Sequence, residues 1–92
     1  MRYKGFYIQI IPKEIIRVMP SGESVLRAGF LIQILDSMDR TAVIDCFTVA
    51  EGFEILKNDP AEAEQFTKDY INTEEKELCR LLDEYHRPRP EE

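Results

Sequence analysis

A heptapeptide that occurs twice places the strongest constraint on what this chain can fold into. Residues 5–11 read Gly-Phe-Tyr-Ile-Gln-Ile-Ile, and residues 29–35 read Gly-Phe-Leu-Ile-Gln-Ile-Leu. Five of the seven positions are identical, and the other two exchange one large apolar residue for another. β-Branched and aromatic residues dominate both copies and neither contains proline, which is typical of β-strands. We therefore predict that both copies are strands.

Turn residues divide the first half of the chain into four predicted strands. Pro12-Lys13 and the run Pro20-Ser21-Gly22-Glu23 are turn signals, because proline presets φ and glycine accepts a positive φ. Residues 36–40 form a polar connection. The predicted strands cover residues 3–11, 15–19, 25–35 and 41–47. Since consecutive strands usually pair with each other, the simplest arrangement is an antiparallel meander.

The spacing of apolar residues changes to that of a helix after Phe47. Thr48 and Glu51 fit the capping-box pattern, and the apolar residues that follow predict a short helix over residues 49–56. Gly52 weakens this prediction by roughly 1 kcal/mol relative to alanine, so a continued strand remains the alternative.

Two further helices are predicted in the second half of the chain. Asp59 followed by Pro60 is typical of a helix start and predicts a helix over residues 60–71. Asn72 is the expected cap of a last helix, which Pro88 ends. The apolar stripe of that helix consists of Leu78, Leu81, Leu82 and Tyr85.

These elements predict an α+β fold. A four-stranded antiparallel meander sheet comes first, followed by two or three C-terminal helices packed on one face. We expect residues 1–87 to form a single domain and residues 88–92 to be a frayed C-terminal tail.

The net charge of −6 arises in the second half of the chain. Residues 1–46 contain six Lys/Arg and five Asp/Glu, whereas residues 47–92 contain six and thirteen. An acidic domain without a basic patch repels the nucleic-acid backbone, so we expect no direct nucleic-acid binding. We expect no membrane insertion either, since no apolar run approaches the roughly 20 residues needed to span a bilayer. With two cysteines and no signal-peptide pattern, a cytoplasmic protein is expected.

Residues that could carry catalysis are sparse. His86 is the only histidine, and it lies near the end of the last predicted helix, where the helix dipole stabilises its cation. Cys46 and Cys79 are expected to be small core residues. Cys79 and His86 are two helical turns apart, roughly 10 Å, which is too far for a nucleophile and its base. We therefore expect no cofactor, no metal and no enzymatic activity.

Acidic residues are concentrated in the predicted helices. The set comprises Glu62, Glu64, Glu74, Glu75, Glu77, Asp83 and Glu84. Such residues usually form a solvated helix face that keeps a domain soluble. The functional alternative is an acidic inhibitor, or a nucleic-acid mimic, that engages a basic partner through this surface.

Alternation along the strands separates two sheet faces. One face carries Phe6, Ile8, Ile10, Phe30, Ile32 and Ile34, and is the predicted core under the helices. The other face carries Tyr7, Gln9, Ile11, Leu31, Gln33 and Leu35, with Ile15, Met19, Val43 and Phe47 as expected neighbours. Two-thirds of those six positions are apolar, whereas a solvated sheet face is normally polar.

A contiguous apolar patch on a small protein usually marks an interface, and a homodimer through the second sheet face is the simplest version. The alternative is that the segment around Phe53, or the chain termini, covers this face within one chain. The sequence thus favours a small cytoplasmic interaction or accessory domain that associates with itself. The acidic inhibitor is the second interpretation, and an enzyme, for which no motif is found, is the third.

Overall fold

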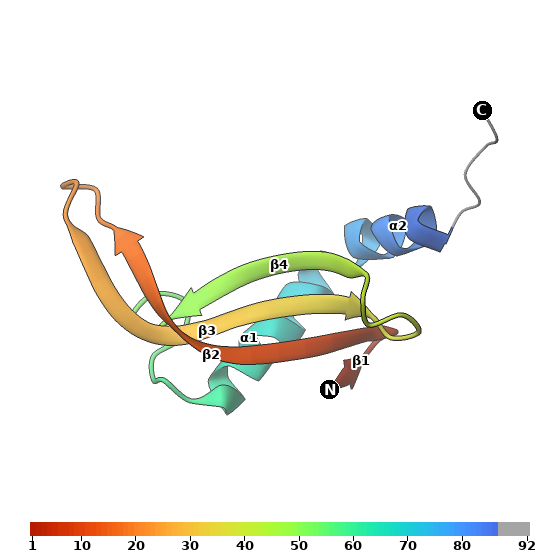
Figure 1. Ribbon diagram of the computed structural model, residues 1–92, viewed down its shortest axis with the longest axis horizontal. Helices are drawn as coiled ribbons and strands as arrows, with labels where there is room; N and C mark the ends of the chain where they lie inside the picture. Colours follow the sequence, from red (N-terminus) through yellow and green to blue (C-terminus); the bar gives the residue numbers. More distant parts are fainter. Residues whose placement is uncertain (87–92) are drawn as a thin grey trace.

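The computed structural model describes residues 1–86, and its element order confirms the predicted α+β fold (Figure 1). The four strands are β1 (Arg2–Tyr3), β2 (Phe6–Val18), β3 (Ser24–Asp36) and β4 (Val43–Ala50), and the two helices are α1 (Pro60–Thr73) and α2 (Glu75–His86). The strands form one antiparallel meander in the order β1-β2-β3-β4. The predicted tail at residues 88–92 lies outside the described residues.

The first strand begins differently from the prediction, because the chain turns at Lys4-Gly5. Lys4 has a φ of 49° and Gly5 a φ of 84°, and two positive φ values in a two-residue hairpin loop are typical of a type I′ turn. Tyr3 therefore pairs with Phe6 instead of preceding it in one strand. Met1 and Ile8 extend this small hairpin by exchanging two main-chain hydrogen bonds.

The predicted turn at Pro12-Lys13 is wrong, since β2 runs straight through it. Pro12 pairs with Phe30 on β3 without a change of register. Ile8 directs its N–H and C=O outward to Met1, and groups on one strand alternate in direction, so Pro12 also directs its nitrogen outward. Proline costs no ladder hydrogen bond there, which is why an edge strand tolerates it.

The two copies of the heptapeptide are confirmed as strands, and they pair with each other. Gln9 lies opposite Gln33, flanked by the pairs Ile8–Ile34 and Ile10–Ile32. The copies are therefore antiparallel neighbours around a local two-fold axis at the glutamine pair.

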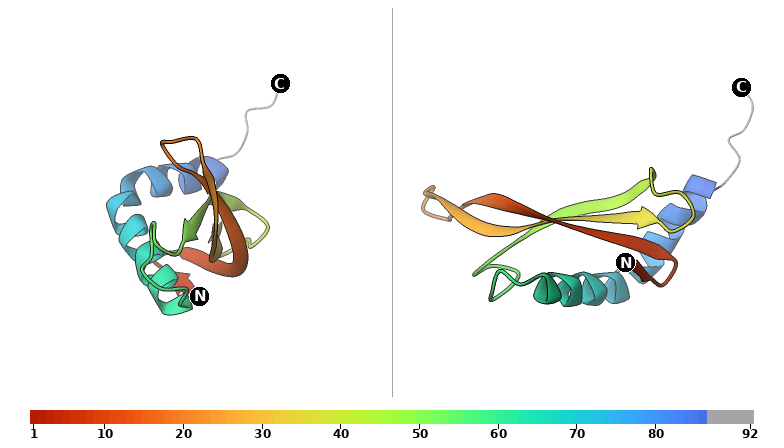
Figure 2. Two further views of the ribbon diagram at one scale, coloured as in Figure 1. Left: turned by 90° about the vertical axis from the view of Figure 1, so that its left-hand side faces the viewer. Right: turned by 60° about the horizontal axis from the view of Figure 1, so that its bottom comes forward.

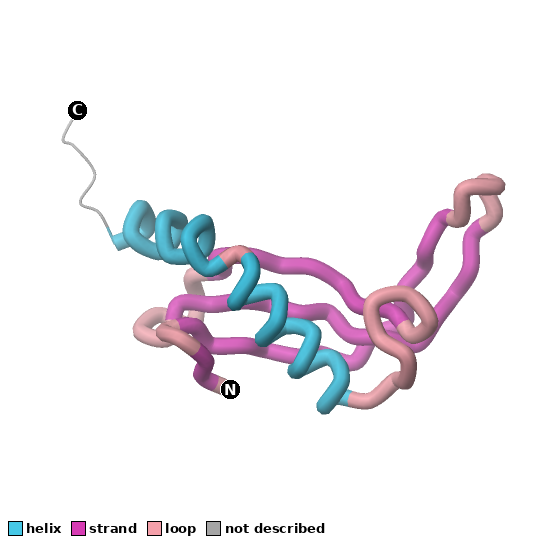
Figure 3. The backbone as a smooth tube through the Cα atoms, turned by 180° about the vertical axis from the view of Figure 1, so that it is seen from behind, coloured by secondary structure: helices cyan, strands magenta, loops and turns pink. Residues whose placement is uncertain are grey.

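The predicted core face is confirmed: α1 crosses it, and α2 packs Leu78 against the core while its later turns extend beyond the sheet (Figure 3). Its buried side chains are Phe6, Ile8, Phe30, Ile32, Ile34 and Val49 of the sheet, with Ile55, Ala63, Ile71 and Leu78. Phe47 also lies on this face, where its ring packs against Phe66 and Tyr70 of α1 at centroid distances of 5.9 and 4.7 Å. The Tyr70 hydroxyl donates a hydrogen bond to Asp45.

Residues 13–28 form a two-stranded ribbon that projects beyond the sheet, which we name the arm (Figures 1 and 2). Gly29 lies next to the base of the arm and pairs with Ala50 at the end of β4. A Cβ at Gly29 would lie 2.1 Å from the Val49 oxygen and 2.9 Å from Ile15 Cγ1. Glycine is therefore required here by a close approach of main chain. The predicted turn at the far end of the arm is confirmed, with Gly22 donating to the Met19 carbonyl.

The segment between β4 and α1 contains no helix, so the short helix predicted over residues 49–56 is wrong. Val49 and Ala50 still belong to β4, and Gly52 has a φ of 82° that a helix does not accept. A bridge between Glu51 and Ile55 closes the segment into a loop.

The helix start at Asp59-Pro60 is confirmed, and the Asp59 side chain accepts from the Ala61 N–H. The predicted cap at Asn72 is wrong, because α1 continues to Thr73 and only Glu74 separates it from α2. Asn72 instead accepts a hydrogen bond from the Tyr3 hydroxyl at 2.9 Å.

Candidate interaction surfaces

The sheet face opposite the helices, which we name the open face, is covered by neither helix (Figure 2). Strand register assigns nine side chains to it: Tyr7, Gln9 and Ile11 of β2, Leu31, Gln33 and Leu35 of β3, and Val43, Cys46 and Thr48 of β4. None of these nine is charged, although a third of the whole chain is. An open sheet surface without charge is unusual, because water-facing sheet surfaces are normally polar.

The six candidate interface residues differ in accessibility. Gln9 is exposed, and Ile11, Leu31 and Gln33 are partly buried. Leu35 is only 3% exposed, so it offers little area to a partner. The Arg40 guanidinium stacks on the Tyr7 ring at 3.9 Å and forms one rim of the surface.

Three expected neighbours of this face lie elsewhere. Phe47 belongs to the helix-covered face and Ile15 is buried at the base of the arm. Met19 lies in the turn at the tip of the arm. Val43 is 52% exposed on the open face, as predicted. Cys46 was expected in the core, and this is wrong: it is exposed on the open face, opposite Gln33.

The segment around Phe53 reaches the open face only at Thr48, whose hydroxyl accepts a hydrogen bond from Arg17, the partner of Glu54. Residues 51–59 lie on the helix side of the sheet, next to the start of α1 (Figure 3). The Phe53 ring lies 5.6 Å from the Arg17 guanidinium of the arm, and Ile55 belongs to the helix-covered core.

The acidic side chains of the helices are largely engaged within the chain. Glu62 accepts from the Leu56 and Lys57 N–H groups, Glu64 pairs with Lys68 at 3.1 Å, and Glu75 pairs with Lys4 at 3.3 Å. Glu77 and Glu84 both pair with Arg80. The hydrogen bond from Arg80 lowers the pKa of Glu77. Five of the seven candidate carboxylates thus bind donors of their own chain, which favours the solvated helix face over the nucleic-acid mimic.

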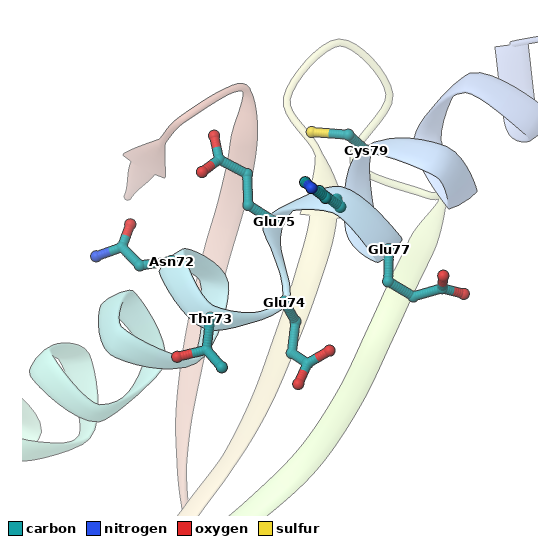
Figure 4. A pocket seen from close by; sticks show the side chains of 7 residues that line it. Asn72, Thr73, Glu74, Glu75, Glu77 and Cys79 are labelled. Carbon is teal, nitrogen blue, oxygen red and sulfur yellow. The ribbon is translucent and has the colours of Figure 1, made fainter.

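A hollow of about 670 Å³ lies where α1 meets α2 (Figure 4). Glu74, Glu75, Glu77 and Cys79 line it together with Asn72 and Thr73. The three carboxylates point in different directions (Figure 4). Among the residues that the structure describes, no group of three or more His, Cys, Asp or Glu side chains could hold a metal ion.

The arm carries the most exposed aliphatic side chains of the sheet. Ile16 is 68%, Val18 71% and Leu26 57% exposed. The three lie on one side of the ribbon, since Ile16 pairs with Leu26 and Val18 is two residues further along. Sequence reasoning missed this surface because it placed a turn at Pro12. If the first strand had been predicted to continue past Pro12, residues 15–18 would have been paired with residues 24–27 of the next strand, which gives the ribbon.

Comparison of the chain with protein-family models, curated protein sequences and solved structures finds no match. Within residues 1–86, neither helix has the length and apolar character needed to cross a membrane.

Proposed function

We propose that the protein is a non-catalytic interaction domain that forms a homodimer through its open face. The observation that carries this proposal is a sheet face that neither helix covers and whose nine strand side chains are uncharged, with Arg40 at one rim and Arg17 at Thr48. Ile11, Leu31 and Val43 would lose contact with water in the dimer, and burial of apolar surface is the dominant favourable term in association.

Charge is the reason to choose a second copy as the partner. The chain has a net charge of −6, so two copies repel each other over most of their surfaces. At the open face they can meet without like charges opposite one another. Gln9 and Gln33 lie side by side at its centre, and each amide can both donate and accept across a two-fold axis.

Both cysteines are free thiols, which suits a reducing compartment. We therefore propose a cytoplasmic location.

The experiment introduces one negative charge into the open face. Leu31→Asp should convert the dimer into a monomer in sedimentation equilibrium, and Met38→Asp, which adds the same charge at an 86% exposed position of the β3–β4 loop, should leave the dimer intact. We expect Leu31→Asp to weaken dimerisation by about 100-fold or more, or roughly 3 kcal/mol, since a charge would be buried without a partner.

A second variant keeps the test decisive if Leu31→Asp unfolds the chain. Gln9→Glu changes an exposed side chain, so it should leave the fold intact while placing two like charges near the two-fold axis. A wild-type protein that stays monomeric at millimolar concentration would refute the proposal. So would a dimer that neither substitution weakens.

A further inference from the structure

The two edges of the sheet are protected to different degrees. On β4, the Ala50 N–H points away from β3 toward Glu54, so alternation gives Ala50, Thr48 and Cys46 the outward main-chain groups. Side chains occupy these three positions: Arg17 donates to the Thr48 carbonyl at 2.9 Å, Glu54 accepts from the Ala50 N–H at 3.1 Å, and Asp45 accepts from the Cys46 N–H at 2.8 Å. Natural sheets commonly use such side chains to block strand addition.

The outer edge of β2 is open along the arm. The alternation that points Ile8 toward Met1 also points Glu14, Ile16 and Val18 outward. Within residues 1–86, no protein group is hydrogen-bonded to the outward N–H and C=O groups of these three residues. The edge therefore offers three donors and three acceptors at the spacing of a β-strand.

The two sides of the arm differ in chemistry. One side presents the exposed apolar row Ile16, Val18 and Leu26. At the base of this row is a depression of about 360 Å³ lined by Pro12, Glu14 and Ala28, among others.

The opposite side of the arm carries all three of its cations. Lys13 and Arg27 are exposed, whereas Arg17 is paired with Glu54. The arm contains three Lys/Arg and two Asp/Glu, so it has a net charge of +1 in a chain of −6.

We propose that the arm binds an extended peptide segment of a partner protein, which adds as a strand to the outer edge of β2. Main-chain hydrogen bonds to Glu14, Ile16 and Val18 provide the affinity, and side chains on alternate positions provide the specificity. An added strand lies about 4.8 Å from β2. Its residues on one side contact Ile16 and Val18, and those on the other side face Lys13. The preferred segment therefore alternates apolar with acidic residues.

The test compares two blocked heptapeptides, one alternating valine with glutamate and the other alternating valine with lysine. We expect the valine–glutamate peptide to bind more tightly by about tenfold or more in isothermal titration calorimetry. It should also slow hydrogen exchange at the Glu14, Ile16 and Val18 amides. The substitution Lys13→Glu should shrink or reverse the preference between the peptides.

Two substitutions at Ile16 separate the backbone contribution from that of the side chain. Ile16→Ala removes most of the apolar side chain and keeps the outward N–H, whereas Ile16→Pro keeps more apolar surface and removes the outward N–H. The native Pro12 occupies an equivalent outward position, so Ile16→Pro should preserve pairing with β3. We expect Ile16→Pro to bind the peptide at least about fivefold more weakly than Ile16→Ala, the value of one backbone hydrogen bond.

Three results would overturn this proposal. They are equal affinity for the two peptides, no loss of binding in Ile16→Pro, and protection of the three arm amides that rises with protein concentration without peptide. The third would identify a second copy as the occupant of the edge. Because the arm and the open face use different residues, peptide binding by a monomeric Leu31→Asp variant separates this proposal from the homodimer.

Discussion

Replacement of Gly29 by alanine tests the geometry that produces the arm. The new Cβ would lie 2.1 Å from the Val49 oxygen, 2.9 Å from Ile15 Cγ1 and 3.0 Å from the Ala50 Cα. Carbon and oxygen atoms in neighbouring strands normally approach to about 3.3 Å. The strands would therefore have to separate by roughly 1 Å at this point, and Val49 and Ala50 are main-chain obstacles that no rotamer change can remove.

The expected cost follows from this displacement. Overpacking of a well-packed site costs about 1–3 kcal/mol, and a ladder hydrogen bond stretched at the same place adds about 1 kcal/mol. We expect Gly29→Ala to lower the free energy of unfolding by about 3 kcal/mol. With a urea m-value of about 2 kcal/mol/M, the midpoint should fall by roughly 1.5 M.

Urea unfolding followed by circular dichroism measures this change, at one protein concentration because dimerisation would stabilise the folded state. Gly5→Ala is the matched control: no atom lies within 4 Å of its Cβ, and only its φ of 84° is strained. It should cost about 1–2 kcal/mol. A cost below 1 kcal/mol for Gly29→Ala, or full rescue by Ile15→Ala, would show that the main chain is not the obstacle.

Two further predictions concern polar contacts. Hydrogen bonding to Asp45, followed by burial, raises the pKa of Tyr70 from 10.0 to about 12. Because the folded-state pKa is the higher one, the stability that the Tyr70 hydrogen bond contributes is complete below pH 10 and is lost as the pH rises from 10 to 12. In urea unfolding, the difference in stability between the wild type and Tyr70→Phe should therefore shrink over that range. Arg17→Ala removes the partner of Glu54 and uncovers the Thr48 carbonyl. It should cost about 1.5–3 kcal/mol, with hydrogen exchange in the arm accelerated more than in the core.

Much of the fold could be predicted because the repeated heptapeptide has an unambiguous period. Its alternation identifies Phe6, Ile8 and Ile10 as core residues in one copy and assigns Gln9 to the opposite face. The local chemistry of Asp59-Pro60 likewise locates the start of α1, since a cap depends on neighbouring residues alone.

The errors arise where tertiary context overrides local preference. Pro12 is a turn residue by propensity, but at an edge position that points outward it costs a strand nothing. A register shift between Ile34 and Leu35 changes the pairing of β4, and Cys46 lies on the open face. A single sequence shows neither which residues of an edge strand direct their main-chain groups outward nor where a bulge shifts the register.

The candidate surfaces show the same division. The apolar character of the open face follows from alternation in the two heptapeptides. The exposure of Ile16 and Val18 depends instead on the arm extending past the end of β4 and beyond both helices (Figure 3). The end of β4 depends on the close packing at Gly29. Gly5 stands at the same position in the first heptapeptide but serves a turn, so the glycine alone does not predict this packing.

The arm also has a consequence for the kinetics of folding. The turn at residues 19–23 joins β2 to β3, so the contacts closest together in sequence lie at the exposed tip. The buried pairs, such as Phe6 with Asp36, are separated by 30 residues. Loop-closure entropy rises with separation, and zippering from the tip lowers that cost for each later pair. We therefore expect the part of the sheet with the least burial to form first, and the central strands to align through it before the helices pack.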